Sequence, residues 1–152
     1  MTPKDMAEIH ALAFTQERPW SENEIDHLSQ QPNVHVLSGA WAFAIYRTVA
    51  DETELLTLAT HPAHRRRGQG ARLCQDWVHR ASKAGAAKAF LEVASDNLAA
   101  LSLYQRLGFL ETGRRPAYYV RKTVPAADAI TMILDLTKRQ VFESDAGGQE
   151  SG

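Results

Sequence analysis

The segment between residues 54 and 93 limits most strongly the folds that this sequence can adopt. A strand-like run at residues 54–60 is followed by a short basic loop with two glycines, and this loop opens a helical pattern. Gly85 ends the helical pattern, and the apolar run at residues 89–93 is typical of a buried strand. This alternation of strand, helix and strand predicts a sheet with helices packed on it. The apolar positions of the helix are Leu73, Trp77, Val78 and Ala81.

Two helices and two strands are predicted before this segment. Thr2-Pro3-Lys4-Asp5 has the features of a helix start, because a Thr cap, an early proline and an acid three residues later favour a first turn. Ser21-Glu22-Asn23-Glu24 is a capping-box sequence and predicts a second helix. The runs at residues 34–37 and 41–49 are strand-like, and the second alternates large and small residues as a half-buried strand does.

The pattern after the central segment continues with a helix and two strands. Asp96-Asn97 caps the helix and Gly108 ends it, and strands are predicted around residues 109–112 and 130–136. The whole order predicts an α/β or α+β domain with a mixed sheet. We expect one domain over residues 1–143, followed by a small, polar, disordered tail over residues 144–152.

Composition excludes several classes of protein. The 152 residues carry 17 basic and 18 acidic side chains, a formal net charge of −1, whereas general nucleic-acid or membrane-surface binders usually have a large basic excess. The single cysteine, Cys74, permits no internal disulfide and fits a reducing cytosol. No stretch approaches the roughly 18 apolar residues of a membrane span. We therefore expect a soluble, cytoplasmic protein.

The loop Arg65-Arg66-Arg67-Gly68-Gln69-Gly70 is the first candidate for chemistry, because it lies between a predicted strand and a predicted helix. Unsatisfied N–H groups and the helix dipole favour a phosphate at a helix N-terminus. Gly68 and Gly70 would let the backbone approach a diphosphate closely. The loop lacks the Gly-Lys-Ser/Thr of a Walker loop and the third glycine of the dinucleotide fingerprint. A basic turn without a ligand and a nucleic-acid contact are the alternatives, although the aromatic residues typical of the latter are missing.

The loop also takes part in a wider resemblance. Arg65-x-x-Gly68-x-Gly70, following residues 55–62, resembles motif A of the GCN5-related N-acetyltransferase (GNAT) superfamily. Within the superfamily the chain is similar to the bacterial ribosomal-protein-alanine N-acetyltransferases, and the resemblance extends from Asp5 to Leu136. Further superfamily matches are Leu91-Glu92-Val93, Asn97, Ala99-Ala100, Leu103-Tyr104 and Leu107-Gly108-Phe109. The subgroup matches are Pro19-Trp20-Ser21-Glu22, Arg114-Arg115, Tyr118-Tyr119 and Asp128-Ala129.

This resemblance implies the GNAT fold, in which a mixed, mostly antiparallel, twisted sheet is splayed at its centre and flanked by helices. It implies acetyl-CoA as co-substrate and no metal, with the pantetheine arm pairing against a strand edge. It also implies that Glu92 is the general base and Tyr104 the general acid. The implied cofactor contacts are Leu58, Ala59, Thr60, Arg66, Arg67, Gly68, Gln69, Gly70, Ala71 and Asn97.

The function implied by the resemblance is acetylation of a protein N-terminal α-amine by direct transfer in a ternary complex. The expected acceptor is the N-terminal alanine of a small-subunit ribosomal protein. Such an amine, with a pKa of about 8, must lose a proton before it attacks the thioester. Glu92 lies in an apolar run, where partial burial would make its carboxylate a better base, and a tyrosine hydroxyl could protonate the leaving thiolate.

Other readings of these residues stay open. The acceptor could be a lysine side chain, a polyamine or another small amine, and the domain could bind acyl-CoA without catalysis. Taken alone, Glu92 would be a solvent-facing strand residue, Tyr104 a core residue and Asn97 only a helix cap. Trp20 could line the acceptor groove or anchor the core, and Tyr118-Tyr119 could close over an acceptor peptide. We expect no direct nucleic-acid or membrane partner, and a monomer or weak dimer.

Some residues predict no chemistry, and others depart from the family pattern. Cys74 is expected to be a small buried hydrophobe, and His61 and His64 solvated loop residues. The helix signal begins almost at Met1, so the strand with which the family normally begins is expected to be missing or very short. Ala94 replaces an arginine common in the subgroup, and Val120-Arg121 replaces its usual Tyr-Tyr-Pro continuation.

Overall fold

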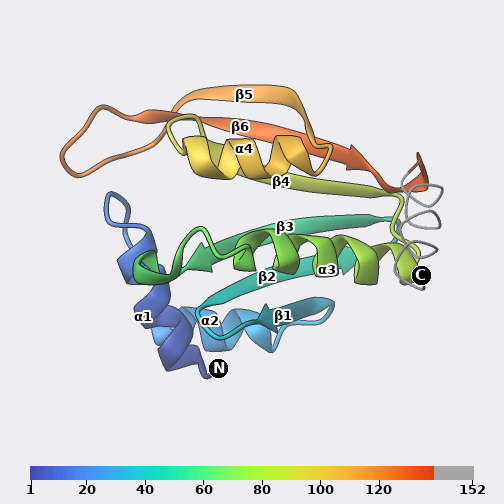
Figure 1. Cartoon of the computed structure of the whole chain (residues 1–152), viewed down its shortest axis with the longest axis horizontal. Coiled ribbons are helices and arrows are strands. Elements are labelled where there is room, and N and C mark those ends of the chain that lie inside the picture. The colour runs from blue at the N-terminus through green and yellow to red at the C-terminus, as the bar shows by residue number, and fades with distance from the viewer. Residues whose placement is uncertain (139–152) are drawn as a thin grey trace.

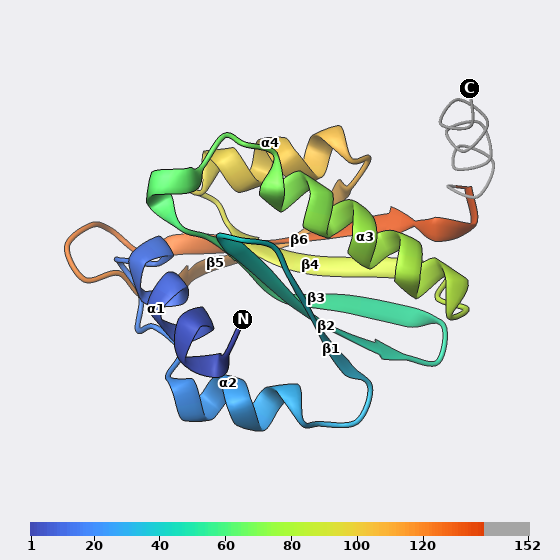
Figure 2. The same cartoon turned by 60° about the horizontal axis from the view of Figure 1, so that its bottom comes forward.

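The computed structural model describes residues 1–138, in which helices cover both faces of a six-stranded sheet (Figures 1 and 2). The expected domain limit at residue 143 and the expected tail over residues 144–152 lie outside this part. The helices are α1 (Pro3–Ala13), α2 (Glu22–Ser29), α3 (Gln69–Lys83) and α4 (Leu98–Arg106), with a 3-10 turn η1 (Pro62–His64). The strands are β1 (Val34–Ser38), β2 (Ala42–Val49), β3 (Glu52–Thr60), β4 (Lys88–Ala94), β5 (Leu110–Tyr119) and β6 (Ala127–Asp135).

Both predicted helix starts are confirmed. The Thr2 hydroxyl accepts the Asp5 N–H at 3.1 Å while the Asp5 carboxylate accepts the Thr2 N–H at 2.9 Å, and Ser21 and Glu24 form the same reciprocal pair. The helix α1 is the first element of the described chain, as expected from the early cap. No helix among residues 1–138 is long and apolar enough to cross a membrane.

The sheet is splayed at its centre, which confirms the predicted fold class. Its strands are ordered β1-β2-β3-β4-β6-β5, and every neighbouring pair is antiparallel except β3 with β4. This parallel pair is short: Glu52, Thr53 and Glu54 of β3 face residues 88–90 of β4. β3 then continues to residue 60 and β4 to residue 94 without pairing further with each other, and their ribbons diverge in Figure 1.

Two apolar cores lie on opposite faces of the sheet. One lies under α3 and α4 and includes the fully buried Trp77, and the other lies under α1 and α2 around Ile25. In β2, Ala44 and Tyr46 belong to the first core and Ile45 to the second. Large and small residues do alternate along β2, but the prediction that the strand is half-buried is wrong, because β2 is buried on both faces.

The strand predicted around residues 109–112 is longer than expected, since β5 runs from Leu110 to Tyr119. Gly113 and Pro116 within it argue against a central strand, because glycine packs poorly and proline has no N–H to donate. β5 is tolerated because it lies at the edge of the sheet and pairs only with β6, with irregular register beside Gly113 and after Arg115.

A buried polar contact joins α3 to the paired end of β3. The Trp77 indole N–H donates to the Thr53 hydroxyl at 2.9 Å, and both side chains are enclosed by the core. The same hydroxyl donates to the Arg47 carbonyl at 3.2 Å and lies 2.9 Å from the Thr48 hydroxyl. α3 is thereby fixed to the sheet beside the short parallel pairing.

We predict that Thr53→Val lowers the free energy of unfolding by about 1–3 kcal/mol, because the shape is kept while the buried indole N–H loses its acceptor. Urea denaturation of the two proteins measures the difference. Thr112→Val, at an exposed position on the edge strand β5, should change stability by less than about 0.5 kcal/mol. Equal effects of the two substitutions would contradict this assignment.

Candidate active site

The loop between η1 and α3 presents an open helix N-terminus. Arg66 and Gly68 both have left-handed backbone, with φ of 65° and 76°. Gly68 is the N-cap of α3 and no side chain caps the helix, so the Arg72 N–H is the first to bond back, to the Gly68 carbonyl at 3.0 Å. The N–H groups of residues 69–71 are thus left for an anion from outside the helix.

The two glycines of this loop have different reasons to be glycine. Gly68 needs its positive φ, which residues with a Cβ adopt only with strain. A Cβ on Gly70 would make ordinary contacts of 3.6–3.8 Å with Leu58, Thr60 and Leu103. The fold therefore requires glycine only at position 68, and at position 70 the absent side chain leaves the first turn of α3 bare.

The side chains of the loop hold neighbouring segments in place. Arg67 and the His64 ring are joined by a 3.0 Å contact, and His64 stacks on Trp41 with ring centres 3.9 Å apart. Partial desolvation and the charge of Arg67 lower the pKa of His64. The Gln69 side-chain oxygen accepts the Trp41 N–H at 3.0 Å, which ties the loop to the segment before β2. The loop histidines are packed on Trp41 rather than simply solvated.

The predicted cofactor residues come together at the open end of the splay. Leu58, Ala59 and Thr60 pair with β2 along one edge of β3, while their other edge pairs with no described strand. The first turn of α3 adjoins this free edge through Gly70. On the other side, Asn97 caps α4 by accepting the Ala100 N–H at 3.2 Å, which confirms its capping role. A free strand edge, an open helix N-terminus and the start of α4 therefore lie at the same end of the splayed sheet (Figure 1).

Glu92 lies on β4 beyond its short pairing with β3. Leu91 and Val93 point into the core under α3 and α4, so the alternation of the strand turns Glu92 to the opposite face. Its side chain is 32% exposed, and Arg115 Nη2 contacts both carboxylate oxygens, one at 2.6 Å. The Thr131 hydroxyl lies 3.5 Å away. The predicted partial burial is therefore wrong: the apolar run leaves Glu92 exposed, and its carboxylate is paired with Arg115 of β5 instead.

An irregular stretch of β5 places Arg115 over Glu92. Ala117 has a left-handed φ of 51°, and its N–H donates to Asp128 at 2.9 Å. The guanidinium of Arg115 also lies over the Tyr118 ring, 4.0 Å from its centre. The resemblance matched Arg115 and Tyr118 without giving them a role at Glu92. Their contacts depend on the register of β5 against β6, for which the sequence carries no local signal.

A pocket of about 610 Å³ reaches from the hairpin between β2 and β3 to Glu92. Four carboxylates and two guanidinium groups line it, together with apolar and small polar residues. The charged residues are Arg47, Asp51, Glu52, Glu54, Glu92 and Arg115. This lining favours a cationic or neutral ligand over an anionic one.

Tyr104 lies on α4 and is only 6% exposed. Its ring packs edge-on against Phe109, and burial raises the pKa of its hydroxyl, which is therefore protonated at neutral pH. That hydroxyl forms no hydrogen bond with any residue in the described part of the chain, although buried hydroxyls usually find a partner. Burial, with the charges of Glu92 and Glu17 next, raises the pKa of Tyr119 to about 12, and Tyr119 also acts on Tyr104. Tyr119 is therefore close enough to interact with both candidate catalytic residues.

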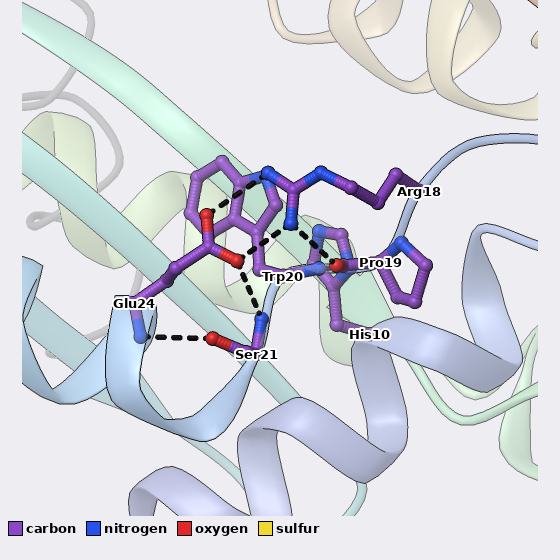
Figure 3. Close-up of polar contacts among 6 residues, drawn as sticks. All are labelled: His10, Arg18, Pro19, Trp20, Ser21 and Glu24. Atoms are coloured by element: carbon purple, nitrogen blue, oxygen red, sulfur yellow. Dashed lines mark hydrogen bonds and ion pairs between the residues drawn. The ribbon is translucent and has the colours of Figure 1, made fainter.

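The segment between α1 and α2 holds Trp20 firmly (Figure 3). His10 Nδ1 accepts the Trp20 N–H at 3.2 Å, and the two rings stack. Burial lowers the pKa of His10 to about 4, so the ring stays neutral and able to accept. Arg18 binds both oxygens of Glu24 at 2.7 and 2.9 Å, and Glu24 also caps α2 through Ser21. Trp20 packs against the core, as predicted for an anchor, and its role in an acceptor groove stays a prediction.

Two other candidates carry no chemistry. Cys74 is fully buried on α3, as expected. Burial raises the pKa of its thiol to about 12, so the thiol is a poor nucleophile. Within residues 1–138, no group of three or more His, Cys, Asp or Glu side chains is arranged to hold a metal ion.

The fold and this site agree with one family of proteins. The family model described as Acetyltransferase (GNAT) family matches residues 4–109, which is more than half of the chain. The chain therefore belongs to the acetyltransferase (GNAT) family.

Individual relatives give a more specific comparison than the family model. The chain is 40% identical over 96 residues to the [Ribosomal protein bS18]-alanine N-acetyltransferase of Escherichia coli (strain K12), a match that covers 63% of this chain and 64% of that protein. It is 33% identical over 138 residues to N-alpha-acetyltransferase RimI of Mycobacterium tuberculosis, covering 85% and 84% of the two chains. The crystal structure of the Escherichia coli ribosomal-protein-S18-alanine N-acetyltransferase superposes with a TM-score of 0.79 at 32% identity, covering 88% and 87%.

We predict that Cys74 does not react with Ellman's reagent in the folded protein at pH 8, because a thiol with a pKa of about 12 is almost entirely protonated there. The chain has one cysteine, so urea-unfolded protein should release one equivalent and serves as the control. Stoichiometric reaction of the folded protein within minutes would contradict the buried, unreactive assignment.

Proposed function

We propose that this protein is an acetyl-CoA-dependent N-acetyltransferase for a protein N-terminal α-amine. The proposed acceptor is the N-terminal alanine of a small-subunit ribosomal protein, and transfer is direct, in a ternary complex. The observation that carries the proposal is the opening between β3 and β4, where a free strand edge adjoins the uncapped N-terminus of α3. The candidate base Glu92 lies on the neighbouring strand.

The donor side of the proposal uses backbone groups. The free edge of Leu58, Ala59 and Thr60 offers N–H and C=O groups to the amide-rich pantetheine arm, as a strand edge does to an added strand. The N–H groups of residues 69–71 face the pyrophosphate, and the exposed Arg66 and Arg67 add positive charge. Because main-chain groups supply most contacts, the donor site depends on local backbone shape more than on side chains.

The chemical step assigns one proton transfer to each candidate catalytic residue. Glu92 takes a proton from the acceptor, whose nitrogen then forms a bond to the acetyl carbon. When the C–S bond breaks, Tyr104 gives its proton to the CoA thiolate. The tyrosinate then regains a proton from the nitrogen, which at that stage carries one more than the amide product does. An ammonium acceptor thus loses two protons overall, one of which reaches solvent through Glu92. The buried hydroxyl of Tyr104, with no described partner, is suited to this donation.

Two observations support the proposed acceptor: the charge of the pocket and the names of the relatives. The pocket that ends at Glu92 has four carboxylates and two guanidinium groups, which favours a protonated amine. The relative from Escherichia coli is named for the alanine of ribosomal protein bS18, and the one from Mycobacterium tuberculosis for N-alpha acetylation. Matches that reach 64% of the Escherichia coli protein and 84% of the mycobacterial one support an α-amine acceptor more directly than a particular ribosomal protein. An acceptor of this kind would place the enzyme in the cytoplasm.

The proposal predicts release of CoA thiol from acetyl-CoA with a short peptide that has a free N-terminal alanine, and none with the same peptide blocked at its N-terminus. Glu92→Gln should lower kcat about 100-fold or more, because the base is lost, and Tyr104→Phe should lower it by removing the acid. Both variants should still bind acetyl-CoA by calorimetry.

The matched control is Glu111→Gln, an exposed carboxylate on β5 that takes no part in the site, and its kcat should equal that of the wild type. Wild-type kcat in the double variant of Glu92 and Tyr104 would refute the assigned roles. Turnover only with lysine side chains or polyamines would replace the proposed acceptor, and acetyl-CoA binding without turnover on any amine would indicate a non-catalytic binding module.

A further inference from the structure

Arg121 lies in the loop after β5, and its buried guanidinium is paired with two partly exposed carboxylates. Its side chain is only 6% exposed, which is unusual for arginine unless the guanidinium is paired. Nη1 contacts the Glu17 carboxylate, and Nη2 donates to Asp96 Oδ1 at 2.8 Å. The guanidinium carbon also lies 5.4 Å from the centre of the Tyr119 ring. We call Arg121, Glu17, Asp96 and Tyr119 the Arg121 cluster.

The members of this cluster come from three segments that are distant in sequence. Glu17 lies between α1 and α2, and Asp96 lies in the turn between β4 and α4, next to the capping Asn97. Glu17 and Arg121 are separated by 104 residues. Arg121 therefore joins the first two segments to the loop that follows β5.

A second set of contacts binds the same two loops together. The Gln16 carbonyl accepts the Lys122 N–H at 3.2 Å. The Gln16 side-chain oxygen accepts both the N–H and the hydroxyl of Thr123, at 3.0 and 2.9 Å. In Figures 1 and 2 the loop after α1 and the loop after β5 lie side by side.

These loops stand at the open end of the splayed sheet. In Figure 1 they lie at the end where β3 finishes and α4 begins, which is also where α3 starts. Tyr119 connects them to the candidate chemistry through contacts: its ring lies 5.2 Å from that of Tyr118, and Arg115, the partner of Glu92, lies over the Tyr118 ring. The pocket that reaches Glu92 from the hairpin between β2 and β3 and these two loops lie at opposite ends of the sheet (Figure 1), so an acceptor whose amine lies at Glu92 has both within reach.

The physics of a buried ion pair favours a positioning role over a stabilising one. Removing the guanidinium from water offsets much of its attraction to the two carboxylates, of which Asp96 stays half exposed, so the cluster adds little net stability. They do restrict geometry, because alternative arrangements leave a buried charge without a partner. The Arg121 cluster is therefore suited to hold three segments in one arrangement.

We propose that Arg121 is a positioning residue for the acceptor: it holds the loops at residues 14–21 and 120–126 as one wall for the body of the acceptor whose amine lies at Glu92. This inference rests on the proposed acetyltransferase function. The wall belongs to the acceptor side, since the donor contacts lie on β3 and on the first turn of α3. Loss of the guanidinium therefore weakens acceptor binding and leaves acetyl-CoA binding in place.

The test compares Arg121→Met with Arg80→Met, which removes an exposed guanidinium paired with Asp76 on α3, remote from the site. Arg121→Met should raise the KM for an Ala-terminated peptide about tenfold or more, because displaced binding groups are costly, and leave the KM for acetyl-CoA within about twofold. Arg121→Lys should restore part of the peptide KM, and Glu17→Gln should raise it in the same direction. Arg80→Met should change neither constant.

Hydrogen exchange gives a readout that does not depend on turnover. In Arg121→Met, exchange in residues 14–21 and 120–126 should rise together, and in Arg80→Met it should not. A peptide KM unchanged from the wild type, or equal rises in the KM for peptide and for acetyl-CoA, would overturn the inference. If the wild type acetylates no peptide, the proposed function fails. In that case the exchange data still test Arg121: exchange that stays unchanged in either loop of Arg121→Met would overturn its role in holding the two loops.

Discussion

The short parallel pairing of β3 with β4 is the constraint on which the rest of the site depends. Three residues of β3 face three of β4, and beyond Glu54 the strands separate. The paired end is held by the core and by the buried contact of Trp77 with Thr53. Because the strands diverge only from that point, one edge of β3 stays open over several residues while the sheet as a whole remains continuous.

The chain arranges two kinds of group around this opening. The proposed donor side is mostly backbone: the free edge of β3 and the N–H groups at the start of α3, where Gly68 supplies the left-handed conformation. The proposed acceptor side is mostly charged side chains, with Glu92 paired with Arg115, and Arg121 paired with Glu17 and Asp96. This division explains how one family scaffold can keep its donor while the acceptor changes, because loop side chains vary more easily than backbone shape.

Much of the fold could be predicted from local sequence signals. The capping boxes at Thr2 and Ser21 and the glycines at positions 68 and 108 mark element ends by interactions within a few residues, and the structure confirms them. The splay could be predicted only through the family resemblance, since no local pattern says where two parallel strands stop pairing. The length of β5 was underestimated because its glycine and proline are tolerated only at a sheet edge, and edge position is a property of the whole fold.

The candidate site likewise has parts that the sequence predicts and parts that it does not. The loop before α3 has a local signature, and the roles of Glu92 and Tyr104 came from the resemblance. The contact of Arg115 with Glu92 and the cluster around Arg121 join residues 23 to 104 positions apart, so sequence reasoning had no signal for them beyond residue type. Glu92 was expected to be partly buried by its own strand, but the residue is exposed and its carboxylate is paired with Arg115 instead.

The most direct test of this account is hydrogen exchange with and without acetyl-CoA. Acetyl-CoA should slow exchange at Leu58, Ala59 and Thr60 and at residues 68–71 together, because one ligand occupies both the strand edge and the helix N-terminus. Binding of acetyl-CoA that protects neither segment, or that protects only the hairpin between β2 and β3, would contradict it.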